Sequence, residues 1–127
     1  MLVTDFLEKS AVRLPEKTAL VIEGRRHSYA EIDSMASSIA GALVSDGLKK
    51  GERAAIFADN SVEAVASIFA VLKAGGVFLM INPTTKAEKL GFILNNSRAS
   101  ALIGQSARQK IINEAIGSAP HIRTVYL

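Results

Sequence analysis

Residues that commonly carry chemistry are few in this 127-residue chain. There is no cysteine, which excludes a thiolate nucleophile, a thiolate metal site and a disulfide framework. His27 and His121 are the only histidines, and neither stands at metal-ligand spacing from a carboxylate. No serine lies in the G-x-S-x-G pattern of a nucleophile elbow. We therefore expect both histidines to be structural or surface residues.

Polar side chains follow two apolar segments that are typical of buried strands. Asp59 and Asn60 come after the first segment, and Asn82 and Thr84 come after the second. Ligands of doubly wound folds bind at the carboxyl ends of parallel strands, so these residues could surround a substrate crevice. Helix capping is the simpler interpretation and the one we favour, because serine, threonine and glutamate at capping spacing stand nearby.

Signatures of phosphate binding are missing from the chain. Neither G-x-G-x-x-G nor G-x-x-x-x-G-K-[ST] occurs. The pair Gly75-Gly76 stands where a helix should end, whereas phosphate loops precede helices, where the N–H groups face the anion. We interpret this pair as a helix stop before a closely packed strand.

Apolar spacing and turn residues predict the elements that hold these side chains. Ser28 and Glu31 stand at capping-box spacing, as do Thr85 and Glu88, and Asp59-Asn60-Ser61 offers further caps. The predicted order is a helix over 5–14, a hairpin of 18–22 and 27–29, a helix closed by Gly47, a strand over 53–58, a helix closed by Gly75, a strand over 77–81, a helix from about 85 to 97, a strand over 99–103, a helix from about 106 to 117, and a strand over 123–127.

This alternation predicts the α/β class, with a parallel sheet covered by helices on both faces and preceded by a helix and a β-hairpin. Residues 1–127 are expected to form a single domain. Because Val77–Ile81 carries no polar side chain, we expect this strand to be buried on both faces. The last strand runs into the final residues without a cap, which suggests that the chain continues elsewhere.

Composition excludes several functional classes. Hydrophobic residues make up 49% of the chain, which excludes intrinsic disorder. The net charge is only +3, and the adjacent basic pairs Arg25-Arg26 and Lys49-Lys50 are typical of turns, so we expect no nucleic-acid partner. Residues 64–81 are apolar apart from Lys73, but the glycine pair interrupts them, so we expect no membrane span. Without a visible signal peptide or cysteine, we expect a cytoplasmic protein.

Five stretches, taken together, resemble segments of the AMP-forming acyl-CoA synthetases and their adenylate-forming, luciferase-like relatives. Any one of them would be weak, but all five agree with the family in order and spacing and together cover essentially the whole chain. They are Leu14-Pro15-Glu16-Lys17-Thr18-Ala19-Leu20, His27-Ser28-Tyr29-Ala30-Glu31-Ile32, Gly47-Leu48-Lys49-Lys50-Gly51-Glu52-Arg53-Ala54-Ala55-Ile56, Asn60-Ser61-Val62-Glu63 and Leu72-Lys73-Ala74-Gly75-Gly76-Val77-Phe78-Leu79-Met80-Ile81-Asn82-Pro83.

The resemblance also indicates a branch of the family. Asn82-Pro83 is typical of acyl- and aryl-CoA ligases, whereas amino-acid-activating domains more often carry an aspartate at this place. The chain departs from the pattern at Met80, where proline is common, and at Glu52, where aspartate is usual. Neither departure argues against the fold that the resemblance implies.

In this family a carboxylate reacts with ATP to give an acyl-adenylate and pyrophosphate, and the thiol of coenzyme A then displaces AMP. The phosphate loop, the residues that serve magnesium and adenine, the ribose-binding aspartate and the C-terminal lysine lie further along the family's chain. None has a counterpart here, so the resemblance transfers no catalytic, cofactor-binding or metal-binding residue. We expect no cofactor on this chain, whereas the full-length enzymes use ATP, magnesium and CoA.

The leading hypothesis is therefore the N-terminal subdomain of an ATP-dependent acid–CoA ligase, inactive when isolated, whose partner is the remainder of the synthetase. The alternative is a stand-alone binding or assembly module that kept the fold and lost catalysis. A weaker reading is a complete small nucleotide-binding protein of flavodoxin-like shape. We also expect self-association, through the strand near 124–127 or through an apolar face left uncovered.

Overall fold

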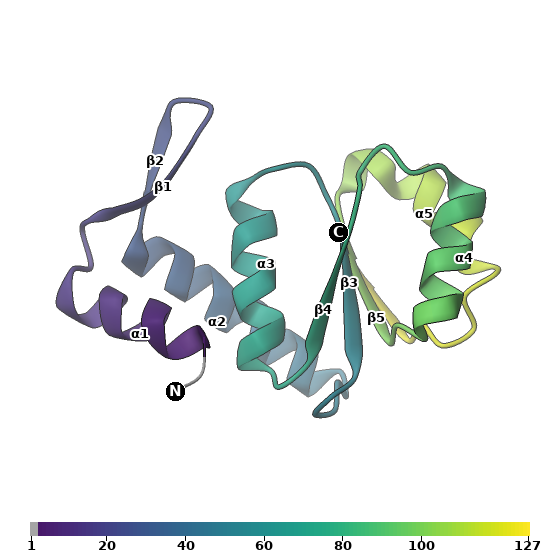
Figure 1. Cartoon of the computed structure of the whole chain (residues 1–127), viewed down its shortest axis with the longest axis horizontal. Coiled ribbons are helices and arrows are strands. Elements are labelled where there is room, and N and C mark those ends of the chain that lie inside the picture. The colour runs from purple at the N-terminus through teal and green to yellow at the C-terminus, as the bar shows by residue number, and fades with distance from the viewer. Residues whose placement is uncertain (1–2) are drawn as a thin grey trace.

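The computed structural model describes residues 3–127 and has three layers, with helices on both sides of a central parallel sheet. Residues 1 and 2, which belong to the N-terminal segment in which no signal peptide is expected, lie outside the described residues. Helices α1, α2 and α3 lie on one side of the sheet and α4 and α5 on the other, while the β1–β2 hairpin stands apart from it (Figure 1). The elements are α1 (Val3–Arg13), β1 (Thr18–Ile22), β2 (Arg25–Ser28), α2 (Tyr29–Ser45), β3 (Arg53–Phe57), α3 (Val62–Lys73), β4 (Val77–Ile81), α4 (Ala87–Ser97), β5 (Ala101–Gly104), the 3₁₀ turn η1 (Ser106–Arg108), α5 (Gln109–Ile116) and β6 (Thr124–Tyr126).

The predicted class and element order are confirmed. The four parallel strands lie in the order β4-β3-β5-β6, so the chain steps from β3 to one neighbour and then crosses to the other. The antiparallel hairpin turns at Glu23 and Gly24, whose φ angles are 51° and 79°. This pair of left-handed residues gives the twist that two-residue hairpins favour.

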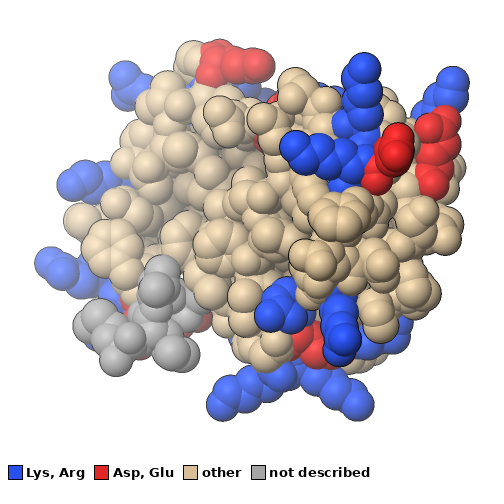
Figure 2. Space-filling view, turned by 45° about the vertical axis from the view of Figure 1, so that its right-hand side comes forward, with Lys and Arg blue, Asp and Glu red and all other residues tan. Residues whose placement is uncertain are grey.

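Charged side chains lie around the outline of one side of the molecule and leave a broad uncharged area between them (Figure 2). Among residues 3–127, no helix combines the length and the apolar character that a membrane crossing requires.

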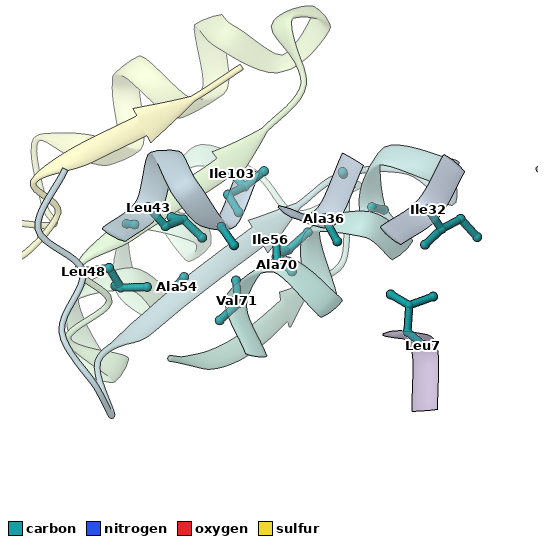
Figure 3. Close-up of a cluster of buried hydrophobic side chains, with 14 residues drawn as sticks. Leu7, Ile32, Ala36, Leu43, Leu48, Ala54, Ile56, Ala70, Val71 and Ile103 are labelled. Carbon is teal, nitrogen blue, oxygen red and sulfur yellow. The ribbon is translucent and has the colours of Figure 1, made fainter. Parts of the chain in front are cut away.

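Two separate clusters of buried side chains form because successive residues of a strand point to opposite faces of the sheet. On the α2–α3 face, Ala54 and Ile56 of β3 and Ile103 of β5 pack with residues of the helices, and Leu7 extends this cluster to α1 (Figure 3). On the α4–α5 face, Phe57 and its neighbours pack against those two helices. The members of the second cluster with no more than 4% exposure are Ala55, Phe57, Ile81, Leu90, Leu94, Ala99, Leu102, Ile112, Ala115 and Ala119.

The prediction that Val77–Ile81 is covered on both faces is wrong. Among residues 3–127, strand β4 pairs with β3 alone and lies at an edge of the sheet, and Val77, Phe78 and Met80 are 49%, 38% and 44% exposed. An apolar strand sequence indicates burial in general, but it does not say which strand the chain order places at an edge.

Two details of the helices also differ from the prediction. Apolar spacing over 62–72 predicts a buried face of Val62, Val65, Ala66, Phe69 and Leu72. The buried positions are instead Ala64, Ala66, Ser67, Ala70 and Val71, and of the predicted residues all but Ala66 are only half-buried. Small side chains face inward because α3 packs closely against both α2 and the sheet. The predicted cap at Thr85 is wrong as well, since α4 begins after Lys86 without a side-chain cap.

Ion pairs and hydrogen bonds tie distant elements to α2. Lys73 at the end of α3 places its Nζ 2.7 Å from Glu8 Oε1 of α1 and 2.9 Å from Asp33 Oδ1 of α2, with only 11% of its side chain exposed. Tyr126 of β6 donates its hydroxyl to Asp46 Oδ2 at 2.6 Å, just beyond α2. Burial, with a further effect of this carboxylate, raises the pKa of Tyr126 to about 12.

Candidate functional site

The carboxyl ends of the parallel strands carry the polar residues that the sequence singles out. Asp59, Asn60 and Asn82 line one hollow of about 330 Å³ between the ends of β3 and β4. Thr84 lies in an adjoining hollow of about 670 Å³, which shares Asn82 with the first. These residues therefore lie together at the carboxyl edge of the sheet, although they belong to two loops.

Local hydrogen bonds show which of these residues cap a helix. Ser61 is the N-cap of α3, because its Oγ accepts the N–H of Ala64 at 3.1 Å. Asn82 closes a turn instead, since its Oδ1 accepts the backbone N–H of Thr84 at 2.9 Å and the hydroxyl of Thr84 at 2.8 Å. Capping thus explains Ser61 and does not explain Asn60 or Asn82.

Asp59 is held by a residue that the sequence analysis missed. The Nη2 of Arg108 donates to both carboxylate oxygens of Asp59, at 2.9 and 2.8 Å, and the guanidinium lies 5.8 Å from the centre of the Phe57 ring. The side-chain oxygen of Gln105 accepts the N–H of Asp59 at 3.1 Å. Arg108 and Asp59 are 49 positions apart, and they meet because β5 lies beside β3. Only the strand order could have predicted the pair.

A larger hollow of about 700 Å³ opens where α2 and α3 meet the ends of β5 and β6. This is where the chain crosses from one side of β3 to the other, the usual place for a ligand in an open α/β sheet. Apolar side chains dominate its walls, and the polar groups at its rim include Asp59, Glu63 and Gln105. Its lining residues are Ser38, Ile39, Ala42, Asp59, Glu63, Ser67, Ile103, Gly104, Gln105, Ser106, Ala107, Tyr126 and Leu127.

The charges at this rim do not suit a polyphosphate. Asp59 and Glu63 are acidic, and the nearby Arg108 already binds Asp59. Within the described part of the chain, no group of three or more His, Asp and Glu residues could hold a metal ion. The hollow therefore offers an apolar surface with hydrogen-bonding groups and an acidic rim.

The two histidines lie elsewhere. His27 is buried in β2, and its Nδ1 lies 3.1 Å from Oε2 of Glu31, four positions further along the chain, so the expectation that no carboxylate stands at ligand spacing from a histidine is wrong for this pair. The side chain of Glu31 thus pairs with His27, while the backbone N–H of Glu31 donates to Ser28 Oγ at 3.2 Å, as the predicted cap requires. His121 is exposed in the connection that leads into β6, at the opposite end of the sheet from the hollows.

The glycine pair is a helix stop, as predicted. Gly75 follows α3 with a φ of 83°, in the left-handed region that favours glycine. A Cβ on Gly76 would lie 3.1 Å from the carbonyl oxygen of Glu52 and 3.1 Å from Leu48 Cδ2. The backbone therefore approaches closely at this point, which only glycine permits without a shift of its neighbours.

A network centred on Glu52 closes the amino end of the sheet. Its carboxylate accepts from Arg123 Nη2 at 2.8 Å and Nη1 at 3.0 Å, from Ser100 Oγ at 2.9 Å and from the backbone N–H of Lys49 at 2.7 Å. These bonds favour the charged form, Arg123 most of all, and they lower the pKa of Glu52 to about 2. Glu52, where aspartate is usual in the family that the chain resembles, thus joins three connections of the sheet.

Comparison with known proteins adds a family to this geometry. The family model for "AMP-binding enzyme" matches residues 7–127. The chain is 41% identical to surfactin synthase subunit 2 of Bacillus subtilis (strain 168) over 84% of its own length and 3% of that protein. It is 28% identical to 3-oxocholest-4-en-26-oate–CoA ligase of Rhodococcus rhodochrous over 97% of its own length and 22% of that protein.

A solved structure supports the same assignment. The anthranilate CoA ligase AuaEII, determined in complex with anthranoyl-AMP, superposes with a TM-score of 0.91 at 26% identity. The superposition covers 98% of this chain and 24% of the ligase. The chain therefore spans less than a quarter of each of these three proteins.

Proposed function

Because the chain belongs to the AMP-binding enzyme family and corresponds to its N-terminal portion, we propose that it is the N-terminal subdomain of an AMP-forming acid–CoA ligase. Such an enzyme joins a carboxylate to ATP, releases pyrophosphate, and then transfers the acyl group from AMP to the thiol of coenzyme A. The observation that carries the proposal is the superposition of nearly the whole chain on an anthranilate CoA ligase. Fatty and aryl acids are the proposed substrate class.

In this proposal the chain supplies a scaffold rather than reacting groups. Its acidic rim at Asp59 and Glu63 does not suit the phosphates of ATP, so ATP, magnesium and CoA are held by the remainder of the synthetase. The isolated 127-residue chain is then expected to form no adenylate. The turn made by Asn82 and the pair Asp59–Arg108 fix the shape of the edge that the remainder would meet.

A second candidate is the amino-acid-activating region of a peptide synthetase. It is favoured by the 41% identity to surfactin synthase subunit 2, which exceeds the 28% identity to the steroid-acid CoA ligase. The turn at Asn82 does not argue strongly against this candidate. Only the side-chain oxygen of Asn82 takes part in that turn, and an aspartate could accept the same two hydrogen bonds.

ATP–pyrophosphate exchange, measured on the protein at the full length that its gene encodes, distinguishes the two candidates. Exchange that depends on a fatty or aryl acid, followed by CoA-dependent release of AMP, supports the ligase. Exchange that depends on an amino acid and needs no CoA supports the second candidate.

The 127-residue chain is the matched control for this assay. Exchange by this chain alone would refute its role as a scaffold. Calorimetry of the same chain with ATP, AMP, CoA and a fatty acid tests the stand-alone binding module, because a scaffold should bind all four poorly. Tight binding of any one of them would favour the module.

A further inference from the structure

Apolar side chains lie exposed around the free edge of β4. This strand pairs with β3 from Val77 to Ile81, and its other edge has no partner strand among residues 3–127. Val77, Phe78 and Met80 are each more than one-third exposed. Phe92 of α4, the helix that follows β4, is 66% exposed. We call Val77, Phe78, Met80 and Phe92 the β4 edge surface.

This surface continues around the edge, because its members lie on both faces of the sheet. Phe78 lies opposite Ala54 of β3, which belongs to the cluster on the α2–α3 face. Met80 points to the same face as Phe78, whereas Val77 points to the opposite face, where α4 lies (Figure 1). Ala54 is fully buried, so the cover that α3 provides ends over β3 and does not reach across β4.

The backbone of β4 indicates which kind of contact suits this edge. Val77 donates its N–H to the carbonyl of Glu52 at 2.9 Å, so every second residue from Val77 onward faces β3. The N–H and C=O groups of Phe78 and Met80 therefore point away from β3. Proline, which has no N–H, is common at the position of Met80 in the acyl-CoA synthetases that the chain resembles. Both residues are apolar and only methionine is a donor, so the shared property favours side-chain packing over an added strand.

The size of the β4 edge surface limits the kind of partner that it can hold. Four exposed side chains are far fewer than the roughly 20–30 residues that each side of a standard stable interface contributes. An independent protein, including a second copy of this chain, would therefore bind here only weakly. A segment joined covalently to the chain needs much less area, because the linkage gives it an effective concentration on the order of millimolar.

The comparison with the anthranilate CoA ligase indicates where such a segment would come from. The superposition covers 24% of that ligase, so most of its polypeptide lies outside the part that this chain matches. The β4 edge surface also adjoins the carboxyl edge of the sheet, since Met80 and Asn82 line one hollow and Phe92 and Asn82 line the next. In the proposed function, this carboxyl edge is the one that the remainder of the synthetase meets.

We propose that the β4 edge surface is a contact for the remainder of the same synthetase chain, which packs apolar side chains over both faces of this edge. The inference rests on the proposed function, in which the chain is one portion of a longer enzyme. It adds the place of the contact and its chemistry. No residue of β4 is charged, so the contact buries apolar area and needs no ion pair with this strand.

Oxidation of Met80 by hydrogen peroxide tests this contact in the wild-type sequence. Mass spectrometry gives the rate for the 127-residue chain and for the protein at the full length that its gene encodes. We expect oxidation to be about tenfold slower in the full-length protein, because the oxidant would reach the thioether only when the contact opens. Val21→Met is the matched control, since Val21 is 58% exposed on the hairpin, and it should be oxidised at the same rate in both proteins.

Two substitutions distinguish side-chain packing from an added strand. Met80→Lys places a charge beneath the proposed cover, so it should lower the urea midpoint of the full-length protein and leave that of the 127-residue chain unchanged. Met80→Pro keeps an apolar side chain and removes only the outward N–H, so it should change both midpoints by the same small amount. If Met80→Pro weakens the full-length protein alone, as much as Met80→Lys does, a strand is added at this edge and the proposed packing is wrong.

Equal rates of Met80 oxidation in the two proteins would overturn the proposal, and so would equal slowing at positions 80 and 21, which would show general occlusion. Neither measurement needs a substrate. An active ligase in which Met80 is oxidised as fast as in the short chain would therefore overturn this inference alone. A full-length protein that protects Met80 and has no ligase activity would overturn only the proposed reaction.

Discussion

Replacing Glu52 with glutamine tests the network at the amino end of the sheet. Glutamine keeps the size of the side chain and one acceptor oxygen, but it loses the negative charge that faces Arg123. Four hydrogen bonds reach the Glu52 carboxylate, from Lys49, from Ser100 and twice from Arg123. They connect the loop before β3 with the starts of β5 and β6, so their loss should weaken the whole sheet.

The structure gives a magnitude for this loss. The pKa of Glu52 falls from 4.5 to about 2, and each unit of a pKa shift corresponds to roughly 1.4 kcal/mol. The side chains of Glu52 and Arg123 are 24% and 48% exposed, so solvent screens much of that energy. We expect Glu52→Gln to lower the free energy of unfolding at pH 7 by about 1–2 kcal/mol.

The dependence on pH distinguishes the charge from the shape of the side chain. A carboxyl whose pKa is lowered on folding stabilises the protein fully above its unfolded pKa, here 4.5, and loses this contribution as the pH falls through about 2. The difference between wild type and Glu52→Gln should therefore be largest above pH 5 and shrink strongly by pH 2.5.

Urea unfolding followed by circular dichroism at pH 7, 4 and 2.5 provides the measurement. Glu16→Gln is the control, because Glu16 is exposed in the turn before β1 and lies outside the network. Equal stability of Glu52→Gln and wild type at pH 7 would refute the role of the network. A difference that stays constant from pH 7 to 2.5 would refute the role of charge.

Three further substitutions test other contacts. Lys73→Met leaves Glu8 and Asp33 without their shared cation, so we expect the free energy of unfolding in urea to fall by roughly 2–3 kcal/mol. Hydrogen exchange in α1 should become faster, and unchanged exchange there would contradict the ion-pair link between α1 and α3. Gly76→Ala pushes a methyl group against the Glu52 carbonyl and Leu48, so we expect the free energy of unfolding in urea to fall by about 1–2 kcal/mol. A variant as stable as wild type would show that this contact is not tight. Tyr126→Phe removes the hydroxyl that donates to Asp46 and should lower the free energy of unfolding by about 1 kcal/mol at pH 7. Because the pKa of Tyr126 is raised, this contribution is present below pH 10 and lost as the pH rises through about 12. A variant as stable as wild type at pH 7 would contradict a stabilising role for this hydrogen bond.

Local chemistry made much of the fold predictable. Ser28 caps α2 through the N–H of Glu31, and Gly47 follows α2 with a φ of 99°, as capping-box and glycine-stop patterns predict. The alternation of helices and strands was enough to predict a parallel sheet with two covered faces. These features depend on neighbours within a few positions of each other, which a sequence displays directly.

The remaining features depend on which strands become neighbours. The exposure of Phe78 and Met80 follows from the edge position of β4, and the pair Asp59–Arg108 follows from the adjacency of β3 and β5. Both residues of that pair are visible in the sequence, but nothing within a few positions of either indicates the other. The meeting of Asp59 with Asn82 was predictable, because parallel strands that follow one another place their carboxyl ends at one edge.

The hairpin has a consequence for how stability is distributed along the chain. A two-stranded ribbon is marginal by itself, and β1–β2 stands outside the sheet and touches the rest chiefly through α2. The backbone of the central strands can exchange its amide hydrogens only when the packed layers on both faces separate. We therefore expect the hairpin to open while those layers stay intact, so that its amides report a local equilibrium and those of β3 and β5 report the unfolding of the whole molecule.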